Sequence, residues 1–315
     1  MGTMYLATIT LQQFTQLTAN GVINGAAYGL LGVGFALILG VTGRFHFAFS
    51  ITYTLAAYLV FTLHNRGQQL DLWLALIVGL TIATALGVGI ERYVYQPLAV
   101  RAGATALLAV FVAALGIGIA GENLIRLFWG SASQSLTGIA QKPIHVAKDK
   151  AIFLNYDVYQ VLSAIVLVLV LAALLRFTPL GRAIKATRGN PEMAQIIGIN
   201  SNVIYMVCFA IGTLFSGVAG FWYAVKFSVI PDMGLRPVIF AFVVAFLAGT
   251  ARSPVRVFLV GIAVSLIEQW SSMLMSVRWT QTAVFVILVL YLISLSVDPK
   301  ALFARARGGL VSVRG

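Results

Sequence analysis

The polar side chains that could do chemistry in this 315-residue chain are few, and the most conspicuous stands inside an apolar segment. Glu268, followed by Gln269, is the only acidic residue deep in such a segment. Placing an ionised carboxylate in a bilayer costs at least about 2.5–3.5 kcal/mol, so Glu268 must be paired, hydrated or protonated. Two roles are open: a place in a solute pathway, or a structural ion pair with Arg278 or a partner subunit. The structural pair is preferred.

A second set of polar residues recurs along one early apolar segment. Asn20, Asn24 and Tyr28 are spaced four residues apart and would share one face of a helix. Polar side chains within a membrane normally face a partner or a cavity. The spacing therefore predicts either the lining of a solute pathway or hydrogen bonds between helices. Thr52, in the next apolar segment, is a further pathway candidate.

The third set is a polar stretch, residues 190–198, which reads NPEMAQIIG. Asn190 is a preferred N-cap residue, and Pro191 suits the first helical position. Glu192 would place negative charge at the positive end of the helix dipole, and Gly198 would close the helix. The pattern predicts a helix of about two turns over 191–197, with Met193, Ile196 and Ile197 on one face.

This short helix has two interpretations. Its apolar ridge could dock into a socket on a partner protein. Alternatively, it could rest on the membrane surface, with Arg182, Lys185 and Arg188 touching anionic lipid headgroups. The physics of the stretch alone does not choose between them.

Enzymatic chemistry has little support in the sequence. The chain carries no nucleophile–base pairing and no G-x-x-x-x-G-K-[ST] phosphate loop, so any ATP hydrolysis would take place on another chain. The single cysteine, Cys208, excludes an internal disulfide, and His46, His64 and His145 lack metal-ligand spacing. We expect no cofactor and no metal, and a membrane-embedded enzyme is disfavoured.

Composition places the chain in a membrane. Hydrophobic residues make up 60% of it and charged residues 10%, against about 45–50% and 25% in soluble domains. Its charge-free runs approach the roughly 20 residues that a bilayer helix needs. We predict an all-α polytopic membrane protein with eight to ten spans. The working count is nine, over 17–41, 45–65, 72–90, 102–121, 158–175, 203–225, 237–251, 257–277 and 279–297, where 237–251 is short enough to be a half-helix.

Small residues indicate how these helices pack. Gly21, Gly25 and Gly29 recur every four residues, and so do Gly212, Ser216 and Gly220. Such spacing lets helix backbones approach closely. We predict two tight helix contacts.

The predicted spans form a single transmembrane domain over 1–315. The distribution of charged residues predicts how this domain is oriented in the membrane. Alternate connections collect 13 basic and 3 acidic residues on one side, and 8 basic and 5 acidic residues on the other. Basic residues concentrate on the cytoplasmic side. Loop 177–202 and the C-terminus are therefore predicted to be cytoplasmic, and loop 122–157 to face outward. With nine spans the N-terminus also faces outward, whereas an extra early span would reverse that end only. Lys226, Asp232 and Arg236 would lie at the outer mouth. The basic charge reflects topology, and no nucleic-acid partner is expected.

Several segments resemble a known family. Glu192-Met193-Ala194 followed by Gly198 is similar to the "EAA…G" loop of bacterial ABC importer permeases. The whole of GRAIKATRGNPEMAQIIGIN (181–200) resembles that loop in the branched-chain amino-acid transporter permeases, in the shorter H-type membrane subunit. Residues 28–49, GIERYVYQPL (89–98), LGIG…EN (115–123) and VDPKALF (297–303) fit the same family.

The chain also departs from the family pattern. His46, Phe49 and Ser50 replace Asn, His and Gly, Gln96 replaces Arg, and AGTARSPVRVF (248–258) replaces a glycine-rich turn. These departures suggest a divergent member whose solute is a branched-chain or other amino acid, an amide, urea or a small organic acid.

The resemblance implies function and partners. In the family, the loop is a coupling helix that docks on an ATPase subunit. It implies two ABC ATPase subunits, a second, M-type permease subunit, a periplasmic or lipid-anchored substrate-binding protein, and a place in the bacterial inner membrane. Its coupling residues would be Asn190, Pro191, Glu192, Met193, Ala194, Ile197 and Gly198. The alternative is an ion-coupled secondary transporter, for which Glu268 alone is thin support.

Overall fold

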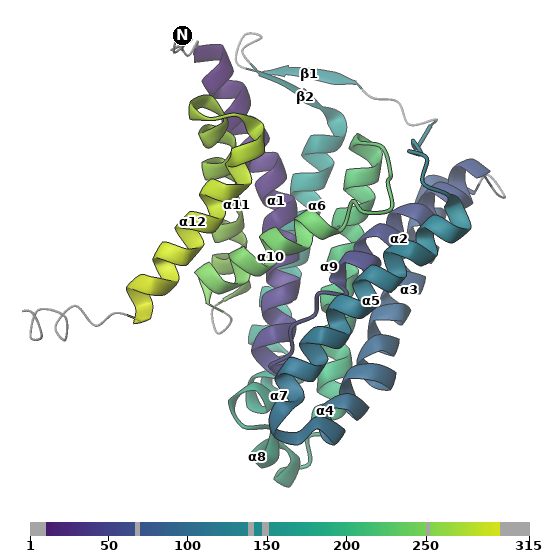
Figure 1. The fold of residues 1–315 in the computed structure, drawn as a ribbon, viewed down its shortest axis with the longest axis vertical. Coiled ribbons are helices and arrows are strands. Elements are labelled where there is room, and N and C mark those ends of the chain that lie inside the picture. Colours follow the sequence, from purple (N-terminus) through teal and green to yellow (C-terminus); the bar gives the residue numbers. More distant parts are fainter. Residues whose placement is uncertain (1–10, 67–69, 138–141, 147–150, 250–252, 297–315) are drawn as a thin grey trace, which may run out of the picture.

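A computed structural model describes residues 11–66, 70–137, 142–146, 151–249 and 253–296. The described chain is a helical bundle with one small β-ribbon (Figure 1). The helices are α1 (Leu11–Thr42), α2 (Phe49–Phe61), α3 (Leu72–Ile90), α4 (Gln96–Ala102), α5 (Ala106–Trp129), α6 (Asn155–Phe177), α7 (Pro179–Gly189), α8 (Pro191–Ile196), α9 (Ser201–Lys226), α10 (Leu235–Ala248), α11 (Pro254–Leu274) and α12 (Val277–Ser296). The strands are β1 (Pro143–Val146) and β2 (Ala151–Leu154).

Three short helical turns complete the secondary structure. The π-helical turns η1 (Thr62–Arg66) and η2 (Glu91–Tyr95) continue α2 and α3, and the 3₁₀ turn η3 (Gly103–Thr105) precedes α5. β1 and β2 form an antiparallel ribbon, with Pro143 opposite Leu154. In Figure 1 this ribbon lies at one end of the bundle, the β-ribbon end, and α8 lies at the opposite end, the α8 end.

The length and hydropathy of the helices fit a membrane protein. Five helical stretches of the described chain are long and apolar enough to cross a bilayer: Gln13–Thr42, Leu72–Trp129, Asn155–Phe177, Ser201–Lys226 and Pro254–Leu274. The second contains both α3 and α5. Leu235–Ala248 and Trp279–Leu290 are shorter apolar helices. The predicted all-α polytopic class is confirmed, and the ribbon is a minor addition to it.

Helix α1 forms the centre of the bundle. It packs against α6, α9, α10 and α11, and its apolar window is 72% buried. The corresponding window of Leu72–Trp129 is only 11% buried. Helices α3 and α5 therefore leave wide apolar faces uncovered by the rest of the described chain, as is typical of helices at the outside of a membrane bundle.

The predicted close helix contacts are present. A Cβ atom on Gly25 would lie 2.6 Å from the Cα of Ile262, and one on Gly261 would lie 2.3 Å from the Cα of Gly29. On α9, a Cβ on Gly220 would lie 2.2 Å from the carbonyl oxygen of Tyr53. These obstacles are backbone atoms, so the α1–α11 and α2–α9 contacts both require glycine.

We therefore expect Gly261→Val to lower the yield of folded protein at least tenfold, because valine would force α11 away from α1. Gly89→Val on α3 is the matched control, since a Cβ there meets nothing within 4 Å. Fluorescence-detected size-exclusion chromatography in mild detergent measures both yields. Equal yields from the two variants would contradict this packing.

Some predicted boundaries were wrong. Helix α5 extends to Trp129 and α6 begins at Asn155, so the connection runs over 130–154 and is shorter than the predicted loop 122–157. It contains the β-ribbon. The predicted span 45–65 begins at Phe49, because residues 43–48 form a connection that starts at Gly43, where φ is +66°. Predictions for residues 1–10, 250–252 and 297–315 lie outside the described residues.

Helix α10 has an unusual position. It is 14 residues long, about 21 Å at 1.5 Å per residue, which is less than the roughly 30 Å of a bilayer core. Figure 1 shows it lying across the bundle in front of α1. Since Val238, Ala241 and Ala245 are buried, protein rather than lipid shields this short helix on its inner face.

Candidate functional sites: the α8 helix and a polar pocket

The first candidate site is α8, whose N-terminus has the predicted cap. Asn190 Oδ1 accepts hydrogen bonds from the backbone N–H groups of Glu192 and Met193, each at 3.0 Å. Pro191 occupies the first helical position, and Glu192 lies in the first turn. Two otherwise unpaired donors are satisfied, and the carboxylate faces the positive end of the helix dipole.

The C-terminus of α8 is equally well defined. The backbone N–H of Ile199 donates to the carbonyl of Ala194 at 2.9 Å, and that of Gly198 donates to Gln195 at 3.0 Å. Gly198 has a φ of +86°, so this is a Schellman ending. The helix proper runs to Ile196, one residue short of the predicted end, because Ile197 is the C-cap.

The two faces of α8 differ sharply in exposure. Met193, Ile196 and Ile197 are 62%, 78% and 71% exposed, and form an apolar ridge at the tip of the bundle. Ala194, grouped with them from the sequence, is only 2% exposed. It faces the protein and packs α8 against the bundle, and its predicted part in coupling stays a prediction.

Neighbouring elements hold α8 in place. Ser201 Oγ, at the start of α9, donates to the carbonyl of Pro191 at 3.1 Å. Helix α7, which the sequence analysis placed in a loop, precedes α8 directly, and Thr178 caps it by accepting from the Gly181 N–H at 3.0 Å. The Thr-Pro pair at 178–179, a cap followed by proline at the first helical position, is the signal that would have revealed α7.

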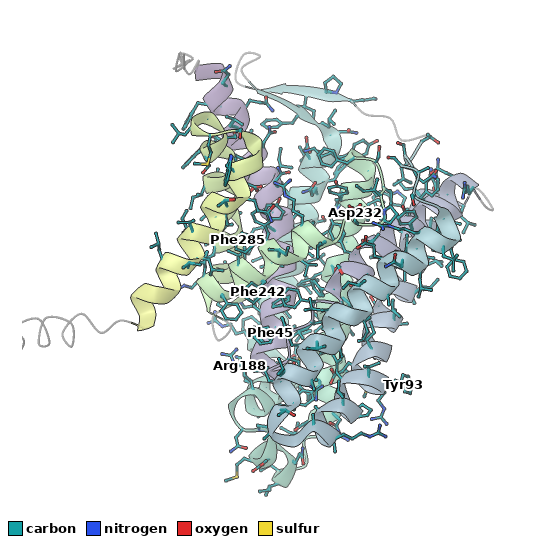
Figure 2. The ribbon with its side chains drawn as sticks, viewed as in Figure 1. Phe45, Tyr93, Arg188, Asp232, Phe242 and Phe285 are labelled. Carbon is teal, nitrogen blue, oxygen red and sulfur yellow. The ribbon has the colours of Figure 1, made fainter. Side chains whose placement is uncertain are left out.

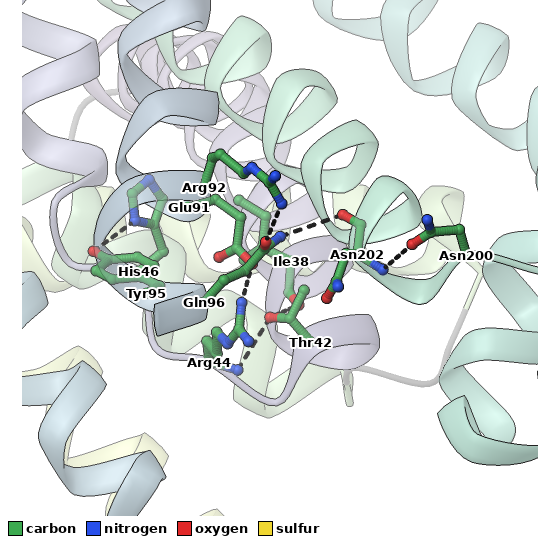
Figure 3. Close-up of polar contacts among 10 residues, drawn as sticks. All are labelled: Ile38, Thr42, Arg44, His46, Glu91, Arg92, Tyr95, Gln96, Asn200 and Asn202. Carbon is green, nitrogen blue, oxygen red and sulfur yellow. Dashed lines mark hydrogen bonds and ion pairs between the residues drawn. The ribbon is translucent and has the colours of Figure 1, made fainter. Parts of the chain in front are cut away.

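A polar cluster with a buried core lies where the α1–α2 connection, η2 and the start of α9 meet (Figure 3). Arg44, in the α1–α2 connection, forms an ion pair with the fully buried Glu91 of η2. His46 Nδ1 lies 3.0 Å from the hydroxyl oxygen of Tyr95. Gln96 Nε2 donates to the carbonyl of Asn202 at 3.3 Å. The cluster therefore links the α1–α2 connection to η2, and the start of α4 to the first turn of α9.

Two residues that depart from the family pattern, His46 and Gln96, lie in this cluster. His46 is fully buried, and its ring contacts the rings of Phe49, Tyr95 and Phe209. Both residues therefore contribute to helix packing, and neither lines the pocket described next.

The second candidate site is a pocket of about 510 Å³ towards the β-ribbon end. Asn24, Tyr28 and Glu268, three of the five predicted pathway residues, line it together. Asn24 and Tyr28 come from α1, and Glu268 comes from α11. Other polar and charged residues complete the lining: Gln269, also on α11, and Tyr53, Gln160, Tyr223, Lys226, Asp232 and Arg236 from other elements.

An ion pair forms part of the pocket wall. Arg236 Nη2, on α10, lies 2.6 Å from Glu268 Oε1, and the Glu268 side chain is 4% exposed against 53% for Arg236. The expected partner Arg278 is thus replaced by Arg236. Arg236 was predicted from the sequence to lie at the outer mouth, with no link to Glu268. A second pair, Lys226 Nζ to Asp157 Oδ1 at 2.7 Å, lies near the first.

The other two predicted pathway residues do not line this pocket. Thr52 is buried and donates to Phe49 O at 2.9 Å, and it lies 3.2 Å from Ser216 Oγ on α9, so it joins two helices. Asn20 accepts a hydrogen bond from Gln16 at 3.2 Å on the same helix. The two asparagines of the pattern therefore differ: Asn20 forms a hydrogen bond within α1, and Asn24 lines the pocket.

These features together define a class of protein: a polytopic helical membrane permease with an ion-paired pocket in its bundle and a capped apolar rod at one end. The model of the family described as branched-chain amino acid transport system / permease component matches residues 17–295. The chain belongs to that family.

Individual relatives agree with this assignment. The chain is 28% identical over 291 residues to the high-affinity branched-chain amino acid transport system permease protein LivH of Escherichia coli (strain K12), covering 89% of this chain and 93% of that protein. It is 26% identical over 294 residues to BraD of Pseudomonas aeruginosa, a permease protein of the same description, with 90% of this chain and 94% of that protein covered.

Among solved structures, PsaBC from Streptococcus pneumoniae matches with a TM-score of 0.49 and 11% identity, over 91% of this chain and 94% of that one.

Family membership fixes the coarse function. The chain is a multi-pass inner-membrane permease subunit of the ABC transporter type, and ATP hydrolysis belongs to partner subunits. The partners of such a subunit include ATPases, a substrate-binding protein and a second permease.

Proposed function

We propose that this chain imports a small polar solute by alternating access, and that α8 receives the mechanical work of ATP hydrolysis. The observation that supports this is the α8 geometry: a short rod fixed at both ends, with Met193, Ile196 and Ile197 exposed and Ala194 seated in the bundle. A ridge with defined ends on a fixed base transmits force without first having to fold. The chain functions as a single domain in this proposal.

The α8 end is the cytoplasmic end in this proposal, and the C-terminus lies on the same side. Arg92, Arg101, Arg182, Lys185 and Arg188 all belong to elements at that end, as the positive-inside rule requires. The β-ribbon end then faces outward. Two ATPase subunits would engage this α8 and its counterpart in an M-type permease, and a periplasmic or lipid-anchored binding protein would deliver solute at the β-ribbon end.

The ion-paired pocket is the proposed solute pathway. Arg236 is half-exposed and can donate two parallel hydrogen bonds to a carboxylate, while Glu268 offers a carboxylate to an ammonium group. A zwitterionic solute can therefore exchange into the existing pair without leaving a buried charge unpaired. This favours amino acids, including the branched-chain ones named for the relatives, over urea, amides or monovalent organic acids.

Site-directed crosslinking in the assembled transporter tests the α8 proposal. Ile197→Cys and Met193→Cys should each crosslink to the cognate ATPase subunit, because both positions lie on the exposed ridge. The native Cys208 is buried and should not react. Ser131→Cys, exposed on the connection after α5, is the control and should give no ATPase crosslink. Ridge positions that never reach the ATPase would overturn the proposal.

Removal of the left-handed residue provides a functional prediction. We expect Gly198→Val to lower ATP-dependent solute uptake about tenfold, since a β-branched residue at positive φ costs at least about 1–2 kcal/mol and would release the Schellman ending. Gly189→Val, two residues before α8 with ordinary φ and open space around it, is the matched control. Uptake into proteoliposomes at equal protein content measures the effect, and equal rates would contradict it.

A further inference from the structure

A groove of about 750 Å³ at the α8 end belongs to neither candidate site. It is bounded by α1, α6, α7 and the start of α11. Its apolar wall includes Val33 and Val41 of α1, which stand about 12 Å apart along the helix axis, together with Leu171 and Val257. The groove is therefore deep enough to hold part of an alkyl chain parallel to α1.

The rim of the groove is cationic. Arg176, at the end of α6, and Lys185 and Arg188, on α7, line it. Among the described residues, none of the three forms an ion pair, since the recorded pairs join other residues. The guanidinium of Arg176 lies 5.3 Å from the ring centroid of Phe177, and Figure 2 shows Arg188 at the edge of the bundle, below α10. Three unneutralised cations therefore border one apolar groove.

This combination selects an amphiphile. A soluble anion would satisfy the rim but leave the apolar wall in water, and an apolar partner helix would fill the wall but leave three cations beside it without counter-charge. A phospholipid supplies both groups in the required order, because its phosphate lies at the membrane surface and its acyl chains run inward. Basic pockets between transmembrane helices bind anionic headgroups in this way.

We propose that this groove is a binding site for an anionic phospholipid, with the phosphate held by Arg176, Lys185 and Arg188 and one acyl chain against α1, α6 and α11. The lipid would join α7 to α1 and α11, and so would stabilise the base on which α8 stands. The site lies at a membrane surface whichever side that surface faces, so it is independent of the function proposed for α8.

Native mass spectrometry of the full chain in detergent, titrated with phosphatidylglycerol, tests the site. A basic residue near a membrane surface is worth about 1 kcal/mol, or about fivefold in affinity. We expect Lys185→Gln/Arg188→Gln to weaken phosphatidylglycerol binding about 25-fold. The control is Arg101→Gln/Arg182→Gln, which removes the same charge from exposed residues outside the groove and should leave binding within twofold.

Further arms separate the possible occupants. Ala172→Trp, which places a large ring in the apolar wall while keeping every charge, should also weaken lipid binding at least fivefold. Phosphatidylcholine should bind at least tenfold more weakly than phosphatidylglycerol. Inorganic phosphate at about 10 mM should not displace the lipid, because it cannot occupy the apolar wall. Equal loss in the control, equal binding of the two lipids, displacement by phosphate, or crosslinking of Ala172→Cys to a partner subunit would each overturn the proposal.

Discussion

Replacement of Glu91 by alanine should destabilise the folded chain by about 3–5 kcal/mol, because it leaves the charge of Arg44 enclosed without its partner. The Glu91 side chain is fully buried and that of Arg44 is 12% exposed. Arg44 also lies over the ring of Tyr205 on α9, 5.2 Å from the centroid, so its displacement would disturb three elements. Thermal unfolding of detergent-purified protein measures the change, as a large drop in Tm.

Two variants distinguish this effect from a general loss of packing. Arg44→Met/Glu91→Leu removes both charges and keeps side-chain volume, so it should recover at least half of the stability lost in Glu91→Ala. Glu122→Ala breaks the exposed pair with Arg126 on α5 and should cost less than about 1 kcal/mol. If the double variant unfolded as easily as the single one, the buried charge would not be the cause.

Local signals in the sequence were sufficient to predict α8. The helix ends are set by three residues that act on backbone groups close to them in sequence: Asn190, Pro191 and Gly198. Their effect on the backbone therefore does not depend on the rest of the fold. The close contacts of Gly25 and Gly220 were also predictable in kind, because small residues at four-residue spacing mark an approach surface. Which helix approaches them was not, since spacing on one helix carries no information about its partner.

The polar pocket shows where such local reasoning ends. Asn24, Tyr28 and Glu268 were selected because polar groups within apolar segments need partners, and this argument holds without knowledge of the fold. Arg236 and Glu268 are 32 residues apart and come from α10 and α11. The nearer Arg278 was preferred, but α10 lies across the bundle and brings Arg236 to the carboxylate. Tyr223 and Gln160 had no periodic signal and enter the pocket only through tertiary packing.

The exposure of individual side chains also could not be predicted from the sequence. Ala194 stands between Met193 and Gln195 in a motif attributed to partner contact, and a single turn of helix decides that it points inward. Conversely, Thr52 is a polar residue in an apolar segment whose hydroxyl forms hydrogen bonds with the Phe49 carbonyl and Ser216 Oγ. A polar type in a span therefore predicts that a partner exists, without predicting whether that partner is solute or helix.

The second large effect is expected at the pocket pair. Arg236→Met should lower ATP-dependent uptake at least 100-fold, because it removes the proposed carboxylate ligand and leaves Glu268 buried without its cation. Such a loss corresponds to about 2.7 kcal/mol or more. Uptake of labelled leucine into proteoliposomes loaded with ATP, supplied with the cognate binding protein, measures it. Because the binding protein captures solute separately, its affinity should not change.

A second substitution separates recognition of the solute from maintenance of the fold. Arg236→Met/Glu268→Gln removes both charges together, so it should restore the folded yield of Arg236→Met while uptake stays low. Lys226→Met, which breaks the neighbouring pair with Asp157 in the same pocket, is the matched control for lost positive charge and should reduce uptake less than tenfold. Recovery of uptake in the uncharged double variant would show that the pair serves only to neutralise a buried carboxylate, and the pathway would then have to lie elsewhere in the bundle.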